Sequence, residues 1–231
     1  MPITVLIPSI EHRLHAYHEL NHRAKSLKKG APLKPTITLT REFGCEGFPV
    51  AEEVIRLIEQ TTGEQWALVD KSLLDAVAKE HDISNDIMHA LGDKPRWLDE
   101  MFATLSSHWK SDSDYYRLIC KQIVSTATAG NAVIVGLGAP IITKNMKNCF
   151  HFRLVAESEF KVKSIARRMN ISKQEAEILV LDNQKERDRI IHKLLDADEH
   201  DALYYHAIFN NSKVGNQRIA RAIANFVVAN E

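Results

Sequence analysis

The hydrophobic positions of the chain change their period near residue 36. Before that point, apolar side chains recur three or four residues apart, which predicts an amphipathic helix over residues 10–29. After it, short β-branched runs alternate with long stretches of helical period, a pattern typical of strand-helix-strand units around a parallel sheet. The runs predicted as strands are residues 36–40, 66–69, 132–135, 150–155 and 204–209.

The same periodicity divides the chain into an extension and one main α/β domain. Further helices are predicted over residues 50–60, 159–169, 172–195 and 216–229. Apolar stripes between the second and third strands predict an all-helical insertion at about residues 82–130. Glycine and proline at residues 30–35 indicate a linker. We therefore expect an N-terminal helical extension over residues 1–35 and a domain over residues 36–231.

Composition excludes several classes of partner. Thirty Lys and Arg balance thirty Asp and Glu, so no overall field favours nucleic acid or an anionic membrane. No apolar run approaches the roughly 18 residues that would cross a bilayer. Cys45, Cys120 and Cys149 are odd in number and widely spaced, which fits a reducing compartment better than a disulfide framework. Without a recognisable export signal, we expect a cytoplasmic protein.

The segment ITLTREFGCEGFPVAEEVIRLI holds the strongest functional signal. It places the first predicted strand before a loop with Gly44 and Gly47, and then a helix that begins near Pro49. Backbone N–H groups and the positive end of a helix dipole converge at such a junction, which makes it a binding site for an anion. On spacing alone, an ordinary strand-helix turn remains an equal alternative.

The loop resembles the Arg-Glu-Phe-Gly-x-x-Gly start of the cytidylate kinase-like family, whose members are related to the nucleoside monophosphate kinases. Arg41, Glu42, Phe43, Gly44 and Gly47 match this motif. The resemblance extends nearly to the C-terminus through segments that occur in the family's order. These segments are residues 69–70, 131–136, 152–155, 165–168 and 210–213.

This resemblance implies a three-layer P-loop NTPase-like fold with a five-stranded parallel sheet, a helical insertion and an extra N-terminal helix. It implies that the loop holds the phosphates of ATP, with Mg²⁺ as counter-ion in an active enzyme, and that a nucleoside monophosphate or similar acceptor binds beneath the insertion. The nucleotide-binding or phosphate-binding residues would be Arg41, Gly44, Cys45, Glu46, Gly47 and Phe48.

The resemblance also implies an acceptor site and a lid. Asp70 and Gly136 would lie near the acceptor, although Asp70 could equally cap the helix that follows it. The lid would span about residues 160–200. Its arginines would stabilise the charge on the transferred phosphoryl group, because phosphoryl transfer depends on arginine forks of this kind. The arginines of this lid, which could also belong to a solvated helix face, are Arg167, Arg168, Arg187 and Arg189.

The loop departs from a standard phosphate loop in ways that leave two functions open. Gly47 and Pro49 occupy the positions of the usual Lys and Ser or Thr. Glu46 would repel a phosphate by about 4 kcal/mol at 4 Å if its carboxylate pointed inward. Leu137 replaces an Arg of the family's acceptor segment. The chain is thus either an ATP-dependent nucleotide kinase or a weak or inactive nucleotide-fold protein with a binding, regulatory or interaction role.

Two further features carry smaller predictions. His15, His18 and His22 share one side of the first helix, but no fourth ligand is evident and no metal site is predicted. The apolar stripe of that helix could dock on its own domain or form a homodimer. The expected partner is otherwise a nucleotide or another small molecule that carries phosphate.

Overall fold

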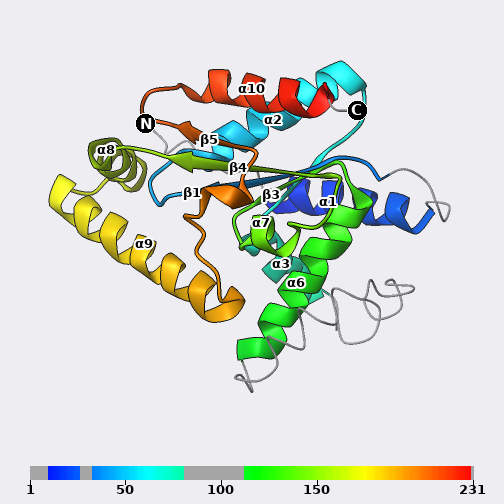
Figure 1. Cartoon of the computed structure of the whole chain (residues 1–231), viewed down its shortest axis with the longest axis horizontal. Coiled ribbons are helices and arrows are strands. Elements are labelled where there is room, and N and C mark those ends of the chain that lie inside the picture. The colour runs from blue at the N-terminus through cyan, green and yellow to red at the C-terminus, as the bar shows by residue number, and fades with distance from the viewer. Residues whose placement is uncertain (1–9, 27–32, 81–111, 230–231) are drawn as a thin grey trace.

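Five parallel strands form the middle layer of the protein in a computed structural model that describes residues 10–26, 33–80 and 112–229 (Figure 1). Their order across the sheet is β2-β3-β1-β4-β5, so β1 lies at the centre. The predicted parallel α/β sheet is confirmed. The strands are β1 (Thr36–Arg41), β2 (Ala67–Val69), β3 (Ala132–Val135), β4 (Cys149–Val155) and β5 (Ala207–Asn210).

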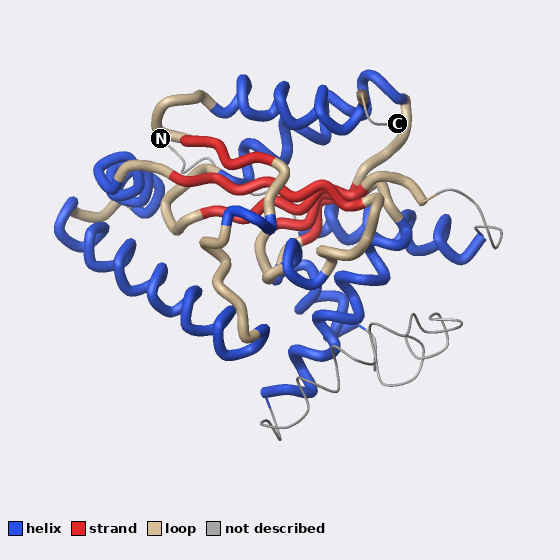
Figure 2. Tube along the Cα trace, viewed as in Figure 1, coloured by secondary structure: helices blue, strands red, loops and turns tan. Residues whose placement is uncertain are grey.

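Helices cover both faces of this sheet (Figure 2). On one face lie α2 (Gly47–Thr62) and α10 (Asn216–Val228). The other face carries α1 (Ile10–Ser26), α3 (Lys71–Glu80), α6 (Asp112–Ala129) and α7 (Ala139–Ile142). A hairpin of α8 (Ser158–Met169) and α9 (Lys173–Leu195) extends beyond the sheet. None of the described helices is long and apolar enough to cross a membrane.

The two faces of the central strand β1 differ in polarity. Ile37 and Leu39 are buried in the core that the sheet forms with α2 and α10. Thr36, Thr38 and Thr40 are equally buried, and by the alternation of a strand they face the opposite layer. Central parallel strands usually carry apolar residues on both faces. A buried polar strip therefore runs along one side of this sheet.

The N-terminal helix docks on its own domain. Tyr17 and Leu20 are buried in the second core together with Ile119 and Ile123 of α6. The domain thus covers Tyr17 and Leu20 of the apolar stripe, and a homodimer through this helix stays a prediction. The expected helical insertion falls largely on residues 81–111, which lie outside the described residues.

The last strand begins later than its sequence pattern predicts. Residues Ala202–Tyr204 form a short 3₁₀ helix, η1, whose first turn is capped by the Asp201 carboxylate accepting from the Leu203 N–H at 2.9 Å. The strand starts only at Ala207. The expectation of a strand from residue 204 was wrong because the amides of Tyr204 and Tyr205 donate to the carbonyl oxygens of Asp201 and Ala202 within this turn instead of to β4.

Candidate functional site

The loop between β1 and α2 is shaped by close approaches that only glycine permits. Gly44 has φ +99°, and a Cβ there would lie 2.6 Å from the Lys161 Cβ of α8. A Cβ on Gly47 would lie 3.1 Å from the Arg41 Cδ. The first glycine therefore lets α8 pack against the loop, and the second leaves room for the Arg41 side chain.

Hydrogen bonds account for some of the amides of this loop but not for all. The Phe43 N–H donates to Gln184 Oε1 at 2.7 Å, and the Glu46 N–H donates to Asn211 Oδ1 at 2.8 Å. The amides of Gly44, Gly47 and Phe48 have no acceptor among the described residues. The latter two belong to the first turn of α2, where backbone N–H groups carry the positive end of the helix dipole. The junction can therefore accept an anion.

Arg41 places a cation beside these amides. A Cβ on Gly136 would lie 2.5 Å from Arg41 Nη1, so the guanidinium occupies the space above that glycine. It also lies 5.8 Å from the centre of the Phe48 ring. In the part of the chain that the structure describes, no carboxylate forms an ion pair with it. Burial, and then the neighbouring Arg187, lower the Arg41 pKa to about 10.

Of the four predicted lid arginines, Arg187 contacts Arg41, and Arg168 acts on it only through its charge. Arg187 Nη1 donates to the Arg41 carbonyl oxygen at 3.3 Å, and its guanidinium lies 4.9 Å from the centre of the Phe43 ring. Burial lowers its pKa, and the positive charge of Arg168 acts in the same direction on both Arg41 and Arg187. Arg187 therefore adds a second positive charge near the end of β1, where the charges of Glu199 and Asp70 act on Arg41 in the opposite direction. Arginines grouped in this way suit the oxygens of a phosphate.

The other two arginines are held by carboxylates. Arg167 Nη2 donates to Glu46 Oε1 at 2.6 Å. Arg189 pairs at 2.6 Å with Glu186, one turn earlier on the exposed side of α9. The structure thus connects Arg167 to the loop through Glu46, and it does not bring Arg189 to the other arginines.

Glu46 does not present a free carboxylate to the anion site. In addition to Arg167, its second oxygen accepts from Asn216 Nδ2 at 2.7 Å, at the start of α10. The neighbouring Cys45 is buried, and burial followed by the charge of Glu42 raises its pKa to about 12. This thiol stays neutral at physiological pH, so the acidified thiol that a helix N-terminus can produce is not formed here.

The two residues expected at the acceptor site have structural partners. Asp70 Oδ1 accepts from the Leu73 N–H at 3.0 Å, which is the helix cap considered above, and from Arg13 Nη1 of α1 at 2.5 Å. Ser72 also donates to its carboxylate. Gly136 has φ +79° and makes room for Arg41. Both residues lie at the carboxyl edge of the sheet, where open α/β sheets bind ligands.

Several residues that shape the site were not predicted from sequence. Gln184 and Asn211 fix the loop amides, and Arg13 neutralises Asp70. A signal existed for Asn211, because it follows the end of β5 at the carboxyl edge of a parallel sheet. No sequence signal marked Arg13, because a single arginine in an amphipathic helix is usually exposed to solvent.

The described side chains fit a phosphate better than a magnesium ion. Within residues 10–26, 33–80 and 112–229, no group of three or more His, Cys, Asp or Glu side chains could hold a metal. Pro49 stands where a hydroxyl ligand would be, and Asp70 is paired with Arg13. By contrast, unpaired amides and Arg41 suit phosphate oxygens.

Comparison with known proteins places the chain among kinase-like folds. The sequence profile of the cytidylate kinase-like family matches residues 36–213. The fold resembles that of an uncharacterized protein from Eubacterium ventriosum ATCC 27560, with a TM-score of 0.64 and 18% identity over 85% of this chain and 99% of that one.

Two more distant structures are also similar. Shikimate kinase from Bacteroides thetaiotaomicron has a TM-score of 0.41 and 12% identity, covering 84% of this chain and 98% of that one. TT1252 from Thermus thermophilus has a TM-score of 0.34 and 13% identity, covering 86% and 98%. No curated protein matches the chain significantly.

Proposed function

This chain belongs to the cytidylate kinase-like family, and from that premise we propose that it binds the phosphates of ATP at the junction of β1 and α2 and transfers the γ-phosphoryl group to a nucleoside monophosphate or similar small acceptor. The fold is nucleotide kinase-like, and the loop between β1 and α2 lies at the carboxyl edge of the sheet.

One observation carries this proposal. Arg41 is a partly buried cation that forms no ion pair among the described residues, although the charges of Glu199 and Asp70 act on it, and it lies beside the unpaired amides of Gly47 and Phe48. An isolated charge removed from water is costly unless an opposite charge compensates it. A phosphate group would compensate the Arg41 charge and accept from both amides at once.

The arginines supply what phosphoryl transfer demands. This reaction needs positioning and charge stabilisation more than covalent chemistry. Arg41 stands in for the missing lysine of the loop, and Arg187 and Arg168 offset the negative charge that spreads over the transferred group. Magnesium supplies counter-charge in kinases generally. Since the described residues do not form a site for it, no step here is derived through a metal.

A second function, nucleotide binding without turnover, is favoured by Asp70 and Pro49. The Asp70 carboxylate is fully engaged by Arg13, Ser72 and the Leu73 amide, which leaves it unsuited to accept a proton from an acceptor or to hold a metal. Pro49 has no hydroxyl to offer. In this alternative the same phosphate site serves regulation or an interaction.

Calorimetric titration with ATP, together with an assay for diphosphate formation, tests both functions. We expect Arg41→Ala to weaken ATP binding about 10-fold to 100-fold, because a hydrogen bond to a charged group contributes about 1.5–3 kcal/mol. The Arg56→Ala variant is the matched control, since Arg56 lies exposed on α2 and pairs with Glu53. It should bind ATP like the wild type.

The outcomes separate the two functions. Diphosphate formed from ATP and CMP, UMP, AMP or GMP, and lost in Arg41→Ala, supports the kinase. ATP binding that depends on Arg41 without turnover of any acceptor supports the binding function instead. Absence of ATP binding, or binding that Arg41→Ala leaves unchanged, would reject both.

A further inference from the structure

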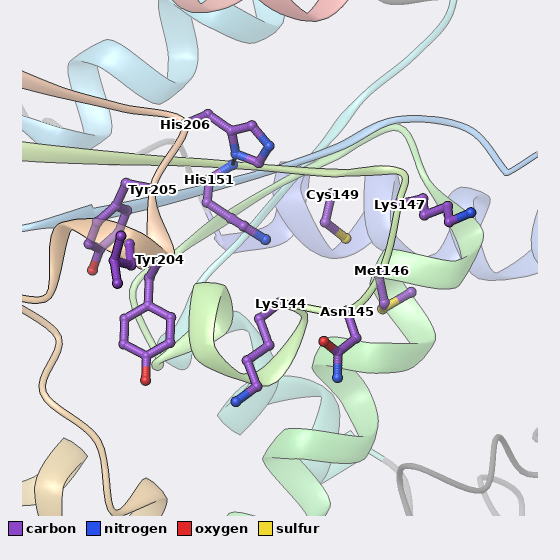
Figure 3. A pocket seen from close by; sticks show the side chains of 10 residues that line it. Lys144, Asn145, Met146, Lys147, Cys149, His151, Tyr204, Tyr205 and His206 are labelled. Carbon is purple, nitrogen blue, oxygen red and sulfur yellow. Dashed lines mark hydrogen bonds between the residues drawn. The ribbon is translucent and has the colours of Figure 1, made fainter.

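A pocket of about 460 Å³ lies far from the phosphate loop, at the amino edge of the sheet (Figure 3). Its walls are residues 144–147 before β4, the first residues of β4, and residues 203–206 before β5. All strands are parallel, so segments that precede β4 and β5 lie at the edge opposite to the loop that follows β1. A volume of this size accommodates a small molecule.

The pocket carries positive charge without a counter-charge. Lys144 and Lys147 line it, and none of its lining residues is acidic. Neither ammonium group forms an ion pair with any residue that the structure describes. The lining therefore favours an anionic ligand.

His151 adds an imidazole to the pocket. The residue is only 5% exposed, and its Nδ1 lies 2.8 Å from Thr38 Oγ1. Thr38 is fully buried, and which of the two groups donates depends on the tautomer of the imidazole. In the tautomer that carries its proton on Nε2, the Thr38 hydroxyl donates to Nδ1 and the Nε2–H is the group that a ligand can accept from.

An aromatic and apolar wall completes the pocket. Tyr204 is half-buried, and Leu203 and Met146 are the aliphatic members of the lining. In Figure 3 the His151 ring extends from β4 on the same side as Tyr204 and Lys144, whereas His206 lies on the other side of the strand. The imidazole of His151 and the ammonium of Lys144 thus lie on the same side of β4 as the Tyr204 ring, which can stack on a planar group.

We propose that this pocket is a second ligand site, which binds a small organic anion that carries a planar ring. The ammonium of Lys144, supported by Lys147, and the Nε2–H of His151 hold the anionic group, and Tyr204 stacks on the ring. The ligand class includes an aromatic carboxylate and a mononucleotide, and the site is independent of the phosphate loop.

Calorimetric titration of the full chain with benzoate, CMP and inorganic phosphate tests this site. We expect benzoate or CMP to bind, and inorganic phosphate to bind at least about 10-fold more weakly because it lacks a ring. The double variant Lys144→Ala/Lys147→Ala should weaken the binding of the ring-bearing anion about 10-fold or more. The control Lys163→Ala/Lys173→Ala removes the same charge from exposed positions of the α8–α9 hairpin and should bind like the wild type.

A second variant keeps the test valid if the lysine variants misfold. His151→Asn retains a polar atom near the position of Nδ1 for Thr38 and removes Nε2, so it should also weaken binding about 10-fold. The Arg41→Ala variant should leave this binding unchanged. The proposal is overturned if neither benzoate nor CMP binds, if binding survives both pocket variants, or if Arg41→Ala abolishes it, which would place the ligand at the loop.

Discussion

Arg41, which is partly buried, differs from the two buried arginines of the described residues in what surrounds its charge. Arg13 pairs with Asp70, and Arg153 lies 3.3 Å from the Glu199 carboxylate. Arg41 instead contacts two glycines and an aromatic ring, with a second arginine close by. A bound anion would stabilise this arrangement, because a partly buried charge without an ion pair opposes folding. Arg13 and Arg153 thus hold the structure together through their ion pairs, whereas Arg41 is the arginine for which we propose a ligand.

His151 allows a test of how burial at a single residue affects stability. Burial, and then His206, lower its pKa from an ordinary 6.5 to about 4. The unfolded chain therefore binds a proton between pH 6.5 and pH 4 that the folded protein does not. The free energy of unfolding is undiminished above pH 6.5 and falls as the pH drops through this window, by about 3 kcal/mol in total.

Denaturant unfolding at pH 7 and pH 5 measures this contribution. The loss of stability between these values should be about 2 kcal/mol smaller in His151→Asn than in the wild type. His15→Asn, which changes an exposed histidine of α1, should lose as much stability between pH 7 and pH 5 as the wild type does. An equal loss of stability between pH 7 and pH 5 in His151→Asn and in the wild type would show that this imidazole is not shielded from protons.

At the scale of elements, α1 is joined to the candidate site by one ion pair. Arg13 and Asp70 are both buried, and the carboxylate also caps α3. Removing one partner of a buried pair strands the other charge away from water. An extension that looks separable in sequence therefore supports the carboxyl edge of the sheet.

Urea unfolding of Arg13→Ala should show a loss of about 3 kcal/mol in the free energy of unfolding. The double variant Arg13→Ala/Asp70→Asn should recover part of it, because asparagine still caps a helix and carries no charge. Arg56→Ala, at the exposed pair with Glu53, should show no measurable change. A small effect of Arg13→Ala that Asp70→Asn does not alter would mean that water reaches the carboxylate.

At the scale of the whole molecule, hydrophobic period was sufficient to predict the layered fold but not the contacts that complete the site. The β-branched runs and the glycine loop are local signals, and they predicted the parallel sheet and the junction of β1 with α2. That this junction binds an anion stays a prediction. The hydrogen bond from Phe43 to Gln184 and the ion pair from Arg13 to Asp70 join positions 141 and 57 residues apart. Such pairings depend on how helices pack on the finished sheet, which no local pattern encodes.

These distant contacts make the α8–α9 hairpin respond to the loop. Phe43 packs into the small core of this hairpin, Gln184 accepts from its amide, and Arg187 donates to Arg41. A phosphate bound at Arg41 should therefore stabilise α9 as well as the loop, as the predicted lid requires.

In hydrogen exchange followed by mass spectrometry, ATP should slow exchange in residues 44–48 and around residues 184–187. Arg41→Ala should abolish both effects, whereas protection confined to the loop would show that the hairpin does not act as a lid.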